Sequence, residues 1–209
     1  MNRYTSREIA RRPSGQEAEP GAAKCIRECA AKSDAFRGTN SLTDSSVEIR
    51  IAATNEELEA AFALRMAVFV EEQRVPPDEE MDGYDVIATH FVACLPVGTD
   101  APGEVIATAR LVDKGAGVGK IGRVAVAAAH RGRKVGAALM RHIHSQAAAQ
   151  GCRQIVLEAQ CYAIPFYEKL GYVAEGPVFL DANIEHRLMR LDLQPECDSR
   201  AAAGSEDVE

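Results

Sequence analysis

The segment that most restricts the fold lies between residues 120 and 159, where three apolar patterns follow one another. Lys120–Val126 has the pattern of a strand, and an apolar residue recurs every four positions through Lys134–Gln150, which predicts a helix. Gly151 ends that helix, and Gln154–Ala159 reads as a buried strand. Strand, helix and strand in this order predict an α/β fold.

Similar patterns flank this segment on both sides. Further strands are expected over residues 47–51, 88–95, 104–112, 172–175 and 186–193, and a short helix over Ile164–Leu170 that stops at Gly171. Thr54 and Glu57 have the spacing of a capping box, which starts a helix that ends at Val75-Pro76-Pro77. The predicted order is β-α-β-β-β-α-β-α-β-β, without an internal repeat.

The two ends of the chain lack such periodicity. Residues 1–46 are rich in Gly, Pro, Ser and scattered charges, and residues 194–209 are acidic and poor in apolar residues. We therefore expect a disordered N-terminal extension, one domain over 47–193, and a disordered acidic tail. A transit signal in the Arg- and Ser-containing Met1–Ser14 is the alternative for the first segment.

Charge and cysteine usage exclude several classes of protein. The net charge of −7 argues against a nucleic-acid surface, because binding to phosphates depends on concentrated Lys and Arg. No run of about 18 apolar residues is present, so no membrane span is expected. The six cysteines fit no zinc spacing, and no secretory signal is evident, so reduced thiols, no bound metal and a cytoplasmic location are expected. The sequence allows a homodimer without requiring one.

A basic, glycine-containing turn joins the strand at Val126 to the helix at Lys134. The first N–H groups of a helix have no internal partner and lie at its positive end, which favours anions. Gly132 and Gly136 permit close approach to the backbone, while Arg131, Arg133 and Lys134 add charge. The turn is therefore predicted to hold a pyrophosphate, although a solvated basic helix start is the structural alternative.

Two motifs together carry a resemblance to a known family. The turn from Arg131 to Gly136 is similar to an Arg-x-x-Gly-x-Gly/Ala pattern, and Ala163-Ile164-Pro165-Phe166-Tyr167 with Gly171-Tyr172 follows the next strand. In this order the chain resembles the GNAT superfamily of acetyl-CoA-dependent N-acetyltransferases over residues 47–193. Arg65-x-x-Val68-Phe69-Val70-x-Glu72-Gln73, followed by Asp82, His90 and His186, is similar to its ElaA-like subgroup.

The resemblance implies a fold and a donor site. The fold would be a central mixed, largely antiparallel twisted sheet flanked by helices, with a parallel strand pair that splays at the cofactor site. Acetyl-CoA would be the acetyl donor, without a metal. The residues that it would contact are Val124, Ala125, Val126, Arg131, Gly132, Arg133, Lys134, Val135, Gly136, Ala137, Gln160 and Phe166.

The turn departs from the family pattern at one position. With Arg131 as its first residue, the pattern expects glycine where Lys134 stands. A lysine keeps the N–H group, so binding is expected to survive if Lys134 has ordinary helical angles. A second register, Arg133-x-x-Gly136-x-Ala138, also fits the pattern.

Acetyl transfer to an amine needs an oxyanion donor, a general acid and a base. A backbone N–H near Val126 is expected to stabilise the oxyanion, and Tyr167 is the expected acid, with a core aromatic as its structural alternative. A protonated amine needs a base, and the candidates are Glu72, His90, Glu158 and His186, of which Glu72 and His90 are assigned to catalysis. A lone strand histidine is more often structural, so the base stays open.

The acceptor side is expected to be lined by Arg65, Gln73, Asp82, Glu158 and His186. Seven acids lie between Glu71 and Asp85, against Arg74 alone. Such a segment either attracts a cationic amine or forms an exposed, solubilising loop.

The function that these features favour is acetyl-CoA-dependent N-acetylation of a small primary amine by direct transfer. Cys161 has no histidine at a spacing that supports a covalent route. Three alternatives remain: an amino-sugar phosphate acetyltransferase using Arg65 or Arg110, a protein N-terminal acetyltransferase, and a non-catalytic acyl-CoA-binding regulatory module.

Overall fold

A computed structural model describes residues 47–96 and 103–193. The predicted disordered extension and tail, the transit signal, and most of the loop predicted over 96–103 lie outside these residues.

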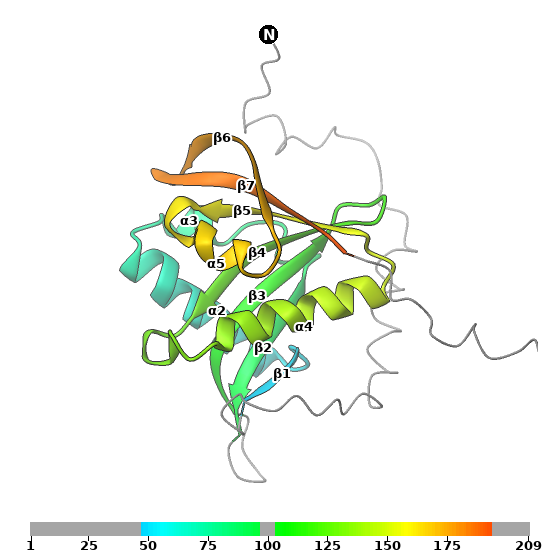
Figure 1. Ribbon diagram of the computed structural model, residues 1–209. Helices are drawn as coiled ribbons and strands as arrows, with labels where there is room; N and C mark the ends of the chain where they lie inside the picture. The colour runs from blue at the N-terminus through cyan, green and yellow to red at the C-terminus, as the bar shows by residue number, and fades with distance from the viewer. Residues whose placement is uncertain (1–46, 97–102, 194–209) are drawn as a thin grey trace, which may run out of the picture. The chain divides into compact units, whose positions relative to one another are not determined.

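One sheet of seven strands forms the centre of the described chain, in the order β1-β2-β3-β4-β5-β7-β6 (Figure 1). The strands are β1 (Glu48–Ile51), β2 (Thr89–Leu95), β3 (Glu104–Asp113), β4 (Val118–Val126), β5 (Gln154–Gln160), β6 (Val173–Asp181) and β7 (Ile184–Asp192). All neighbours pair antiparallel except β4 and β5, which run parallel. The predicted mixed, largely antiparallel sheet is confirmed.

Helices cover both faces of this sheet (Figure 1). They are α2 (Asn55–Arg65), α3 (Pro77–Glu80), α4 (Val135–Ala149), α5 (Ile164–Glu168), the π-helix η2 (Met66–Glu72) and the 3-10 turns η3 (Ala128–His130) and η4 (Cys161–Ala163). The α4 helix crosses one face, and α2 lies behind the other. Within the described ranges, no helix is long and apolar enough to cross a membrane.

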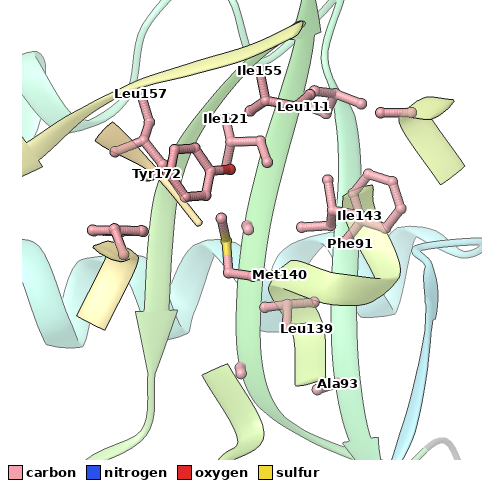
Figure 2. Close-up of a cluster of buried hydrophobic side chains, with 14 of the residues drawn as sticks. Phe91, Ala93, Leu111, Ile121, Leu139, Met140, Ile143, Ile155, Leu157 and Tyr172 are labelled. Atoms are coloured by element: carbon pink, nitrogen blue, oxygen red, sulfur yellow. The ribbon is translucent and has the colours of Figure 1, made fainter. Parts of the chain in front are cut away.

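The predicted four-residue period of α4 forms its buried face. Leu139, Met140 and Ile143 are fully buried against Phe91 of β2 and Ile121 of β4 (Figure 2). Each such aliphatic side chain contributes about 1.5–3 kcal/mol by leaving water. This packing fixes α4 across β2, β3 and β4, and so fixes where its N-terminus lies.

The first helix starts as predicted but continues differently. Thr54 caps it by accepting the N–H of Glu57 at 3.3 Å, while the Glu57 carboxylate accepts the N–H of Ala53 at 2.7 Å, one residue earlier than in a standard capping box. The same carboxylate pairs with Arg50, which draws it toward β1. Beyond Arg65 the helix widens into η2, an insertion type that is frequent at functional sites.

The parallel strands β4 and β5 pair only briefly. Their register covers Val118–Lys120 against Gln154–Val156, although both strands continue well beyond it. The predicted splayed pair is therefore confirmed, and the gap opens toward the carboxyl ends of both strands.

Candidate active site

The gap between β4 and β5 exposes backbone groups of β4. Ala127 donates its N–H to Ile106 of β3 at 2.9 Å, so the preceding residue, Val126, directs its groups to the opposite edge, toward β5. The carbonyl of Val126 accepts a hydrogen bond from Nε of Arg131 at 3.0 Å. Val126 thus lies where the sequence placed it, at the edge of the gap.

The start of α4 lies beside this edge. The first bond within the helix runs from Ala138 N–H to the Lys134 carbonyl at 3.0 Å, which leaves the N–H groups of Val135, Gly136 and Ala137 without a helical partner. Gly132 has a φ of 76°, and a Cβ built on it would meet no atom within 4 Å. This open, positively polarised turn fits a diphosphate.

Lys134 has a left-handed backbone, with φ 64° and ψ 5°, at the N-cap of α4. The condition of ordinary helical angles is therefore not met at Lys134, which has the conformation that glycine adopts most readily. The left-handed angle falls where the pattern beginning at Arg131 expects glycine, whereas Gly136 lies inside α4. The structure therefore favours the first register.

Three elements meet at Gly136. A Cβ at this position would lie 3.4 Å from Cγ2 of Val126 and 3.6 Å from Cζ of Phe166. The last residue of β4 and the ring on α5 therefore both lie against the first turn of α4. The structure brings these three predicted cofactor residues together.

Tyr167 follows Phe166 on α5 and is buried, with 9% of its surface exposed. Its ring packs edge-on against Phe166, with centroids 4.9 Å apart, and against Tyr172 at 5.8 Å. Burial raises the pKa of Tyr167 above its usual range, with a smaller contribution from Tyr162. Its phenol is therefore protonated at neutral pH, as a hydrogen-bond donor must be.

The end of η2 spans the mouth of the gap. Glu72 pairs with Arg131, at 2.8 and 3.0 Å, on the β4 side. The next residue, Gln73, accepts from Nε2 of Gln160 at 2.7 Å and donates to the hydroxyl of Tyr162 at 3.3 Å on the β5 side. Sequence reasoning missed Tyr162, for which its place just after the strand end at Gln160 is the one available signal.

Arg65 and Asp82 lie instead in an ion-pair network between the loop after α3 and the sheet. Arg65 is 1% exposed and binds Glu80 at 2.6 Å and Asp85 at 2.7 Å. Arg110 of β3 binds Asp82 at 2.6 and 2.7 Å, and Asp85 at 2.8 Å.

Ion pairs occupy much of the acidic segment between Glu71 and Asp85. Of its seven acids, four pair with arginines, and these are Glu72, Glu80, Asp82 and Asp85. Most of the expected local field is thereby neutralised, and three of these carboxylates hold the fold rather than forming an exposed loop.

Three other predicted residues have structural partners. His90 is buried, with Nε2 2.9 Å from the Asp85 carbonyl, and burial lowers its pKa, so it is mostly neutral at pH 7. His186 is also buried, with Nδ1 2.9 Å from the Ile184 carbonyl. Glu158 pairs with Lys120 at 2.7 Å. No hydrogen bond joins any of the three to Tyr167 within the described residues.

A cavity of about 210 Å³ lies beside the start of α4. Its lining includes Val47, Ile49 of β1, His130 and Arg133 of the turn, and Val135 of α4, and it includes neither Phe166 nor Gln160. It therefore shares Arg133 and Val135 with the predicted donor site, whereas the residues that meet in the gap do not line it.

Comparisons with known proteins agree with this geometry. The model of the acetyltransferase (GNAT) family matches residues 58–172. The uncharacterized N-acetyltransferase YjcF of Bacillus subtilis (strain 168) is 38% identical over 146 residues, which cover 68% of this chain and 97% of that protein.

Solved structures give the same result. An acyl-CoA N-acyltransferase from Pseudomonas aeruginosa has a TM-score of 0.58 at 32% identity, and ElaA from Escherichia coli has 0.58 at 28%. Each comparison covers 69% of this chain and 97% of the other. The resemblance to this family and to ElaA that the motifs indicated is confirmed.

Replacing Lys134 by glycine is expected to stabilise the protein. A side chain in the left-handed region costs roughly 1–2 kcal/mol, part of which glycine loses again through its greater freedom in the unfolded chain. Urea denaturation should show Lys134→Gly about 1 kcal/mol more stable than the matched control Lys134→Ala, which retains the strain. Equal stability of the two variants would contradict the assigned backbone.

Asp85 is expected to make the free energy of unfolding depend on pH in the acid range. Burial disfavours its charge, but hydrogen bonds and charges from Arg65 and Arg110 outweigh burial and lower its pKa to about 2. Since the unfolded pKa is about 3.9, this stabilisation of roughly 2 kcal/mol is complete above pH 4 and is lost as the pH falls toward 2.

Urea denaturation of Asp85→Asn tests this directly. The difference in unfolding free energy from the unaltered protein should shrink between pH 6 and pH 2.5. Glu175→Gln, which breaks the exposed pair with Arg190, serves as the control without such a trend. A difference that does not vary with pH would refute the role of Asp85.

Proposed function

The chain belongs to the acetyltransferase (GNAT) family, and from this membership we propose that it transfers an acetyl group from acetyl-CoA directly to a primary amine of a small molecule. Membership establishes an acyltransferase. One observation carries the finer proposal: Glu72 and Gln73, consecutive at the end of η2, contact the β4 side and the β5 side of one gap. Donor and acceptor groups thus converge at one mouth.

The donor side fits coenzyme A. The N–H groups of Val135–Ala137 would bind its pyrophosphate, with charge from Arg131 and Lys134, because they lie unpartnered at the positive end of a helix. Backbone groups of Val126 and the amide of Gln160 would bind the pantetheine arm in the gap. When bound, acetyl-CoA supplies an activated thioester.

Glu72 is the base that the geometry favours. Its side chain is 41% exposed, and its Arg131 partner also binds the Val126 carbonyl, so the carboxylate lies close to the expected thioester. His90 is buried beneath the loop that contains Asp85, where an amine has no direct approach. An amine with a pKa near 10 must lose a proton before attack, and Glu72 would accept it directly or through water.

Tyr167 would act on the leaving group. A thiol with a pKa near 8.5 is a stronger acid than this buried phenol, so complete proton transfer to the thiolate is uphill. Tyr167 therefore contributes best as a hydrogen-bond donor to the sulfur as charge develops there.

The ion-pair network bears on the alternative functions. An amino-sugar phosphate would need a free basic site, but the guanidinium groups of Arg65 and Arg110 are both occupied by carboxylates. A covalent route through Cys161 gains no support, because no hydrogen bond joins it to a histidine among the described residues.

Incubation of the protein with acetyl-CoA and a panel of small amines should release free thiol in an amine-dependent manner. Tyr167→Phe should lower kcat about 100-fold, in the range of one lost hydrogen-bond donor to charge that develops in the transition state, while calorimetry shows coenzyme A binding unchanged. Tyr84→Phe, on the loop after α3, is the matched control and should retain full kcat. Coenzyme binding without thiol release from any amine would indicate a regulatory module instead.

Removing the carboxylate of Glu72 should produce a defect that depends on pH. In Glu72→Gln we expect kcat/KM to fall about 100-fold at pH 7 and to recover toward pH 10, where the amine is deprotonated without help. The control Glu71→Gln alters the neighbouring exposed acid and should leave the profile unchanged. A loss of the same size at every pH would exclude Glu72 as the base.

A further inference from the structure

The β4 strand contains a bulge immediately before the gap. Ala125 lies opposite Thr108 and Gly122 lies opposite Arg110, so two residues of β4, Arg123 and Val124, face one residue of β3. Arg123 has a φ of 54°, in the left-handed region, which is uncommon for a residue with a long side chain. Bulges of this kind redirect a strand next to an active site.

The bulge reverses which residues of β4 face the gap. Ahead of it, the Val118 carbonyl accepts Lys114 N–H at 2.9 Å, so even-numbered residues turn their backbone groups toward β3. Beyond it, Ala127 N–H donates to Ile106, so odd-numbered residues do. The even-numbered Val124 and Val126 therefore direct their N–H and C=O groups toward β5, whereas a regular strand would direct them toward β3.

A dense set of contacts holds Arg123 in this conformation. Its guanidinium donates to the carbonyls of Glu79 at 2.8 Å and Glu80 at 3.0 Å, and pairs with the Glu80 carboxylate at 2.8 Å and with Asp82 at 3.2 Å. Glu80 is itself 2% exposed and fixed by Arg65 at 2.6 Å. A strained backbone conformation persists where several separate contacts hold the residue in place, as they hold Arg123.

We propose that Arg123 is a positioning residue for acyl transfer, which by clamping the bulge to α3 and Asp82 presents the backbone of Val124 and Val126 to the acyl-pantetheine arm. This inference rests on the proposed function. The planar fork of arginine suits the role, because it reaches two carbonyls and two carboxylates at once. Arg123 itself contacts the loop after α3, so it acts through the strand.

Two ligands separate this role from general damage to the fold. Acetyl-CoA uses both the turn and the gap, whereas adenosine 3′-phosphate 5′-diphosphate, which lacks the pantetheine arm, uses the turn alone. In calorimetry, Arg123→Ala should weaken the binding of acetyl-CoA about tenfold, which is the effect of losing two neutral hydrogen bonds between the β4 backbone and the pantetheine arm. The affinity for the fragment without the arm should stay unchanged. Arg123→Lys, which keeps the charge but loses the fork, should show a smaller loss with the same selectivity.

Arg50→Gln provides the matched control, because it removes an arginine from the buried acid Glu57 at the far edge of the sheet. It should lower stability and alter neither affinity. If the Arg123 variants lose affinity for both ligands equally, or lose no affinity for acetyl-CoA, the proposal is overturned. If the unaltered protein binds neither ligand, the proposed function itself fails.

Discussion

Two parallel strands that pair over three positions and then separate leave backbone groups that neither strand satisfies. The surrounding elements are arranged around this constraint. At one edge of the gap, Arg131 of the turn before α4 donates a hydrogen bond to the carbonyl of Val126. At the other edge, Gln73 at the end of η2 accepts a hydrogen bond from the side chain of Gln160. The backbone groups of Val124 and Val126 face the gap, and under the proposed function the amide groups of the pantetheine arm would pair with them.

The loop after α3 performs a different task from the one its charge suggests. Two of its carboxylates and that of Glu80 at the end of α3 bind three arginines on α2, β3 and β4, so this segment is held to the sheet at the point where β4 bulges. The helix α2, the segment from Glu80 to Asp85 and the strands β3 and β4 therefore share one network. The apolar core under α4 packs against the other face of the sheet (Figures 1 and 2).

The sequence predicted most of the fold, because most elements have a local signal of their own, but the short helix α3 and the continuation of β6 to Asp181 were not predicted. The four-residue period of α4 and the glycine stop at Gly171 are read directly from the chain, and the structure has both. The widening of α2 into η2 had no such signal, since the same residues also suit an ordinary helix.

The candidate site was predicted less evenly. Residues in the two motifs, such as Gly136 and Phe166, meet as expected, because motif spacing encodes backbone geometry. The partners of Arg65 and the clamp at Arg123 depend on contacts between residues far apart in the chain, which charge patterns alone do not determine. The left-handed angle at Lys134 is a property that the motif indicates through the glycine it expects there, although lysine itself has no preference for that angle.

Amide chemical shifts recorded during a titration with coenzyme A test the central claim most directly. If the gap holds the coenzyme, the largest shifts will fall on Val126, Gly136 and Gln160. Shifts concentrated instead on Val47 and Ile49, which line the cavity beside the start of α4, with the gap residues unmoved, would contradict the account.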